Sequence, residues 1–143
     1  MNSNGAKVLG AEILFNIGHT NKLETFENNV VMINAFDDIS FDKVLPKSIE
    51  KLKGKVISLI TDSQHLHEVD NVKNYLEKNK IIVKVGKGKG QLNDGQVFGC
   101  EFFPAIENKE VADVNLFLGQ SNFNAAGIAL STKKTNICLR SLF

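Results

Sequence analysis

Short apolar runs, rich in β-branched residues, recur along the chain and constrain its fold more than any other feature. Each run is too short for a helix and is bounded by polar residues or glycine, as β-strands are. Several are apolar nearly throughout, which is typical of strands that are covered on both faces of a sheet. The predicted strands are Ile13–Ile17, Val30–Ile33, Val56–Ile60, Ile81–Val85, Val114–Leu118 and Asn136–Leu139.

Helical patterns lie between the predicted strands. Apolar residues at a spacing of three to four predict a helix over residues 64–79, and Thr61 followed by Gln64 gives its start the form of a capping box. Two further candidates are residues 41–53 and the alanine-rich residues 122–131. Strands that alternate with helices predict right-handed βαβ units and a parallel sheet.

The fold class expected from this order is α/β, with a three-layer α/β/α repeat built on a short, mainly parallel sheet. Residues 51–143 contain the full alternation and are expected to form one such repeat. Residues 1–50 contain two strands and no clear helix before Phe41, so we expect them to be the C-terminal part of a preceding, partial repeat. The chain length of 143 residues suits this arrangement.

Charge and cysteine content exclude several classes of protein. The 17 basic and 16 acidic residues leave a net charge of +1, which provides no strong field for nucleic acid or a membrane surface. No apolar stretch approaches the ~20 residues that span a bilayer. Residues 1–10 are polar, unlike a signal peptide, and the two cysteines show no disulfide pattern. We therefore expect a cytoplasmic protein with reduced thiols.

The segment Gly86–Cys100 contains five glycines before its cysteine. Glycine at this density lets backbone N–H groups turn toward a ligand. Phosphate contact through Lys87 and Lys89 is one interpretation, although neither the P-loop nor the dinucleotide fingerprint fits. The other is a reactive thiolate at Cys100, against the alternative of a buried core cysteine. A glycine-rich loop favours the thiolate, since cores are built from strands and helices.

Other chemically active residues carry weaker signals. Cys138 lies within an apolar run and is expected to be a buried strand cysteine. His65 and His67 are two residues apart and would face opposite sides of a helix, while His19 follows a strand directly. The turn that begins at Gly119 opens a helix, so it is either an anion site or a simple capped turn with Ser121 or Asn122 as the N-cap.

Three of these segments together resemble a known family. Gln64–His67, Asp94–Cys100 and Gly119–Phe123 occur in this order and together resemble the diphthamide synthesis family, especially the archaeal enzyme of the first step. The residues from Leu9 to His19 also resemble part of the first repeat of that family. The resemblance extends from about residue 7 to residue 139.

The resemblance implies a specific chemistry. Members of the family fold as three related α/β repeats, and each repeat of the archaeal enzyme gives one cysteine to a 4Fe-4S cluster. An open iron position receives S-adenosylmethionine, whose reductive cleavage yields a 3-amino-3-carboxypropyl radical for transfer to a histidine of translation elongation factor 2. Cys100 matches the cysteine of the second repeat. The cofactor-binding residues expected beside it are Gly95, Gln96, Gly99, Gly119, Ser121 and Asn122.

The sequence departs from the family in two respects. The cysteine segments of the first and third repeats are not found, and Asn124 stands where the family has a histidine. We therefore expect a partial or split synthase, which transfers the group only when the missing repeats or a partner subunit complete it, and which could also form a homodimer. The alternatives are a non-catalytic interaction module of the same lineage, or an α/β domain that binds a small anionic ligand at Gly86–Gly90 and Gly119–Asn122.

Overall fold

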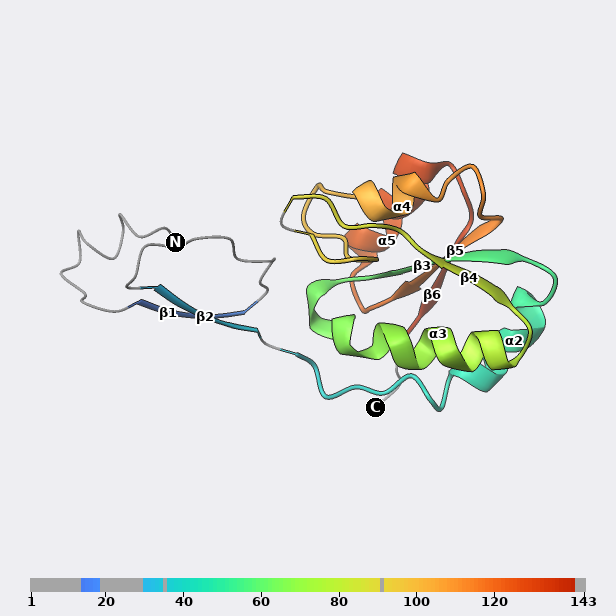
Figure 1. Ribbon diagram of the computed structural model, residues 1–143, viewed down its shortest axis with the longest axis horizontal. Helices are drawn as coiled ribbons and strands as arrows, with labels where there is room; N and C mark the ends of the chain where they lie inside the picture. Colours follow the sequence, from blue (N-terminus) through green and yellow to red (C-terminus); the bar gives the residue numbers. More distant parts are fainter. Residues whose placement is uncertain (1–13, 19–29, 35, 91, 141–143) are drawn as a thin grey trace.

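The main body of the protein is a four-stranded parallel sheet with the strand order β4-β3-β5-β6 (Figure 1). This computed structural model describes residues 14–18, 30–34, 36–90 and 92–140. The sheet's strands are β3 (Val56–Thr61), β4 (Ile82–Val85), β5 (Val114–Leu118) and β6 (Asn136–Leu139). The prediction of an α/β fold with a parallel sheet is confirmed.

Two further strands form a parallel sheet of their own (Figure 1). They are β1 (Leu14–Gly18) and β2 (Val30–Asn34), each close to its predicted position. Ile13, the predicted first residue of β1, lies outside the described residues. The division of the chain at residue 50 stays a prediction.

Helices cover both faces of the four-stranded sheet, as expected for a three-layer unit. Figure 1 shows α2 and α3 on one side of the strands, with α4 and α5 on the other. The helices are α2 (Leu45–Leu52), the 3-10 helix η1 (Ser63–Glu68), α3 (Val69–Lys78), α4 (Phe103–Glu107) and α5 (Asn122–Thr132). Because Leu45 and Leu52 are fully buried in the core beneath α3, α2 belongs structurally to this sheet.

The two faces of the sheet are packed differently. The face under α2 and α3 carries the larger apolar core, in which Leu59, Leu76 and Leu116 are fully buried. The face under α4 and α5 has a smaller core. Polar pairs supplement that smaller core, because the side-chain amide of Asn115 donates a hydrogen bond of 2.8 Å to the Thr132 hydroxyl in α5.

The predicted helix over residues 64–79 is wrong in its first turn. The chain forms η1 there, and the α-helix begins only at Val69. In a 3-10 helix, residues three apart lie one above the other, which brings the His65 ring onto Asp62. Asp62, not Thr61, caps this turn by accepting the Gln64 N–H, because Thr61 is still part of β3.

Sequence periodicity missed α4, which is five residues long and too short to show a repeat. The N-cap of α5 is Ser121, one of the two expected residues, whose hydroxyl accepts the Asn124 N–H. The α5 helix ends one residue beyond its predicted limit. These short elements matter because α4 and α5 follow the two loops that build the candidate site.

The central strands should dominate stability. We expect Leu116→Ala to lower the free energy of unfolding by about 2–5 kcal/mol, because the fully buried side chain leaves a cavity in the larger core. Leu130→Ala is the matched control, since Leu130 in α5 is 79% exposed and should cost far less. Urea unfolding followed by circular dichroism measures both. Equal losses would contradict the described core.

Candidate functional site

A hollow of about 260 Å³ lies at the carboxyl ends of β3 and β5. Parallel neighbours in a sheet end at the same edge, so the segments that follow these two strands meet there. The third side is the end of the glycine-rich loop. The lining residues are Asp62, Ser63, Gln64, Val97, Phe98, Gly99, Ser121, Phe123 and Asn124.

The end of the glycine-rich loop is attached to β3 by backbone hydrogen bonds. The Thr61 N–H donates to the Gly95 carbonyl at 2.9 Å, and the Val97 N–H donates to the Thr61 carbonyl at 2.8 Å. Between these two anchors, the fully buried Gln96 side chain donates to the Ser63 hydroxyl at 2.8 Å and accepts from Asn93. The loop is therefore fixed to the end of the sheet before it reaches the cysteine.

Cys100 lies at the tip of a tight turn that follows this anchor. Phe98 and Glu101 exchange two backbone hydrogen bonds of 3.2 and 2.9 Å, so Gly99 and Cys100 are the two central residues of a hairpin turn. Gly99 has a φ of +56°, the left-handed value that glycine supplies at the first central position of a type II′ turn. The Cys100 thiol is free and exposed, beside the two hollow-lining residues Phe98 and Gly99.

The turn after β5 closes the opposite side of the hollow. A Cβ atom added at Gly119 would lie 2.6 Å from Asp62 Oδ2 and 2.7 Å from the Phe117 ring, so only glycine allows this approach. Ser121 uses its hydroxyl to cap α5. Asn122 is exposed, and its side-chain oxygen accepts a hydrogen bond from Arg140.

Asp62 and His65 form a buried pair below the hollow. Asp62 Oδ1 lies 2.6 Å from His65 Nδ1 and accepts the Gln64 N–H at 3.2 Å. The imidazole is completely buried, and its Nε2 lies 3.9 Å from Asp37 Oδ2. Sequence reasoning singled out His65 but missed Asp62, although a polar residue directly after a buried parallel strand was the available signal.

In the rest of the glycine-rich loop, backbone N–H groups donate hydrogen bonds to carboxylates of the protein itself. Asp94 accepts the Gly88 N–H at 2.9 Å and pairs with the Lys87 ammonium at 2.8 Å, while Glu107 accepts the Lys87 N–H. The hydrogen bond and charge of Asp94 raise the pKa of Lys87 above its ordinary value. These backbone donors and this lysine are already satisfied within the protein, which argues against a phosphate cradle at Gly86–Gly90.

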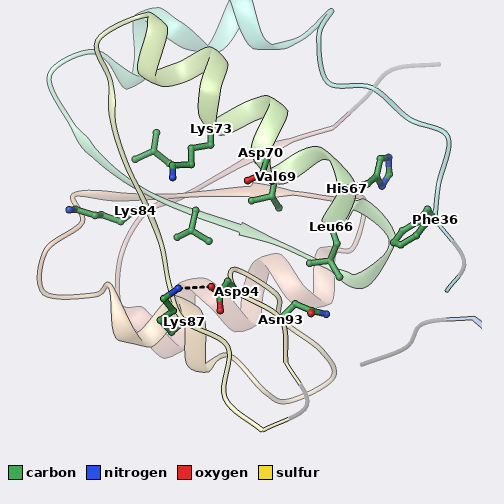
Figure 2. Close-up of a pocket in the computed structure, with 12 residues that line it drawn as sticks. Phe36, Leu66, His67, Val69, Asp70, Lys73, Lys84, Lys87, Asn93 and Asp94 are labelled. Atoms are coloured by element: carbon green, nitrogen blue, oxygen red, sulfur yellow. Dashed lines mark hydrogen bonds and ion pairs between the residues drawn. The ribbon is translucent and has the colours of Figure 1, made fainter. Parts of the chain in front are cut away.

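A larger hollow of about 650 Å³ lies along the free edge of β4 (Figure 2). Figure 2 shows Lys73, Lys84 and Lys87 at one end of it and Phe36 with His67 at the other. Asp70 and Asp94 offset the lysine charges, and its lining contains no cysteine. The chemistry of this hollow is therefore mixed in charge and separate from the Cys100 turn.

The remaining residues singled out by the sequence lie in different places. Cys138 in β6 is partly rather than fully buried and packs against the smaller core. The His67 ring contacts Phe36 edge-to-face, with centroids 5.3 Å apart. His19 lies outside the described residues. Within the described ranges no three His, Cys, Asp or Glu side chains gather in a group that could hold a metal ion.

Comparisons with known proteins identify the relatives of this arrangement. Residues 1–141 match the profile of the diphthamide synthesis protein family. The chain is 30% identical over 132 residues to the 2-(3-amino-3-carboxypropyl)histidine synthase of Pyrococcus horikoshii, covering 90% of this chain and 38% of that protein. It therefore spans about two fifths of the length of that curated relative.

Solved structures agree with this match. The crystal structure of Dph2 from Pyrococcus horikoshii with a 4Fe-4S cluster superposes with a TM-score of 0.83 at 29% identity, covering 94% of this chain and 40% of that one. A second crystal structure of the same protein gives a TM-score of 0.79 at 28% identity. None of the helices in the described residues has the length and hydropathy that a membrane crossing requires.

The close approach at Gly119 can be tested by substitution. We expect Gly119→Ala to destabilise the protein by about 1–3 kcal/mol, because the added methyl group collides with Asp62 and Phe117. Gly54→Ala is the control, since Gly54 has a φ of +73° but open space around it, and only the backbone strain of about 1 kcal/mol applies. NMR amide shifts at residues 62–65 should change in the first variant alone. Unchanged shifts there would contradict the described contact.

Proposed function

Because this chain belongs to the diphthamide synthesis protein family, we propose that it forms part of a diphthamide synthase in which Cys100 is one thiolate ligand of a 4Fe-4S cluster. The observation that carries this proposal is the exposed thiol at the tip of the Phe98–Glu101 turn, beside a hollow at the carboxyl edge of the sheet. Residues 51–143 would then act as the second of the family's repeats.

The residues fit one corner of a cluster site. Iron–sulfur clusters are held by several cysteine thiolates, and an exposed cysteine on a closed turn can approach such a group without disturbing a core. Within the described residues Cys138 is the other cysteine, and it lies in β6 against the smaller core. The remaining ligands would therefore come from other repeats or from a partner subunit, consistent with the greater length of the Pyrococcus relative.

The chemistry that a bound cluster supplies is the reductive cleavage of S-adenosylmethionine, which provides the 3-amino-3-carboxypropyl group for a histidine of elongation factor 2. The hollow between β3 and β5 would receive part of that small molecule. Gly99 leaves the approach to the thiol open, since nothing lies within 4 Å of where its Cβ would stand. The site of action is cytoplasmic in this proposal, because its target is a translation factor.

Asn124 limits the proton-transfer chemistry available in this hollow. It lines the hollow where the family resemblance places a histidine, and its backbone N–H is taken by Ser121. A carboxamide donates and accepts hydrogen bonds but does not titrate near neutral pH. We infer that Asn124 orients a ligand rather than exchanging a proton with it.

The ligand role of Cys100 can be measured in the assembled protein. Co-expression of this chain with a polypeptide that carries the remaining repeats, purified without oxygen, should yield a brown complex with bound iron and a broad visible absorption band. Cys100→Ser should remove the band and most of the iron, because one thiolate ligand is lost. Cys138→Ser is the matched control and should leave both unchanged.

An unchanged band in Cys100→Ser would refute the ligand role. A wild-type complex that assembles and captures elongation factor 2 but contains no iron would instead support the non-catalytic module of the same lineage. The melting temperatures of the two serine variants should stay close to the wild-type value in the absence of iron, which separates a lost ligand from a damaged fold.

A further inference from the structure

Asp62 is the one charged side chain among the described residues that line the 260 Å³ hollow. The other lining groups are neutral, and two of them, Phe98 and Phe123, are exposed aromatic residues. A carboxylate and two aromatic rings in a lining that contains no lysine or arginine favour a cationic ligand group, through charge pairing and through the ring quadrupoles.

The two oxygens of Asp62 have different roles. Oδ1 is used by the fold, because it accepts the Gln64 N–H and lies 2.6 Å from His65 Nδ1. Oδ2 lies close to Gly119, where an added Cβ would be 2.6 Å away, and it forms no hydrogen bond with any described residue. The carboxylate group is only 11% exposed, so its free oxygen has little access to water other than through the hollow.

His65 holds this carboxylate in one orientation. Its ring is completely buried and packs edge-to-face on Phe41, with centroids 5.5 Å apart. A ring enclosed in this way cannot turn aside, so the Nδ1–Oδ1 contact fixes the direction in which Oδ2 points. Asp37 faces the opposite ring nitrogen at 3.9 Å, which places carboxylates on both sides of the imidazole.

We propose that Asp62 Oδ2 receives the ammonium group of the small molecule bound in this hollow, and that His65 is the positioning residue that aims the carboxylate. The ligand class is a primary ammonium compound with an aromatic or sulfonium neighbour. This inference rests on the proposed function, since S-adenosylmethionine carries an ammonium on the group to be transferred. It assigns a specificity-determining role to a residue that holds no metal.

Calorimetric titration of the 143-residue chain tests this proposal with two probe compounds whose sulfur is an uncharged thioether. S-adenosylhomocysteine carries the ammonium, and methylthioadenosine lacks the whole amino-acid group. Asp62→Asn should weaken S-adenosylhomocysteine binding about tenfold or more, because a charged hydrogen bond is lost, and should leave methylthioadenosine binding unchanged. Tighter binding of S-adenosylhomocysteine by Asp62→Asn would mean that Asp62 repels the ligand carboxylate, and it would overturn the proposal.

Two substitutions at position 65 test whether His65 orients the Asp62 carboxylate or only fills space in the fold. His65→Leu fills the cavity but removes the donor to Asp62, and should weaken S-adenosylhomocysteine binding severalfold. His65→Asn places an amide N–H where the imidazole Nδ1 stands, and should restore most of the affinity. Equal weakening in both variants would overturn the positioning role, since a merely structural histidine would not be rescued by asparagine.

The results of these binding titrations are independent of the results that test the proposed function. Wild-type chain that binds neither probe, or Asp62→Asn chain that binds S-adenosylhomocysteine as tightly as the wild type, would overturn the ammonium site. Neither result affects the cluster, which is judged by iron and visible absorption in the assembled complex. Asp62→Asn should keep the cluster band, and loss of the band in Cys100→Ser would stand whatever the probes show.

Discussion

Thr61 is the residue on which the arrangement of the site depends. Its backbone pairs with Gly95 and Val97 of the glycine-rich loop, and its fully buried hydroxyl donates to the Leu118 carbonyl at the end of β5 at 3.2 Å. One residue therefore ties the loop, β3 and β5 together at the carboxyl edge of the sheet. The positions of Asp62, Gly119 and the Cys100 turn all follow from this connection, because each lies within a few residues of an anchored atom.

The glycine-rich loop shows how the same composition can serve two different purposes. Backbone N–H groups that glycines turn inward can donate hydrogen bonds to an anionic ligand, or they can donate to carboxylates of the protein itself. Here Asp94 and Glu107 fill that role, and the paired Lys87 is part of the same internal network. The loop is thus held by hydrogen bonds within the protein, and it ends in the turn that exposes Cys100.

The sequence predicted the strands better than the site, for physical reasons. A buried parallel strand is a continuous apolar run, so Val114–Leu118 and Asn136–Leu139 were found with their observed limits. The 3-10 turn at Ser63–Glu68 could not be read from periodicity, because the Asp62–His65 contact overrides the helical pattern. Asp62 was missed for a related reason, since its role depends on the approach of Gly119, which lies 57 residues further along the chain.

Cys100 contributes nothing to the two apolar cores of the described α/β unit. The core is built from strands and helices with fully buried residues such as Leu59 and Phe117, and the Cys100 turn is closed by backbone hydrogen bonds alone. Small metal-dependent domains behave differently, since their ligands are brought together only when the metal is bound. If Cys100 is a cluster ligand as proposed, its single exposed thiolate would hold metal only together with ligands supplied from elsewhere. Iron bound in an assembled complex would therefore report on completion of the proposed site, because the apolar cores that hold the α/β unit together do not involve Cys100.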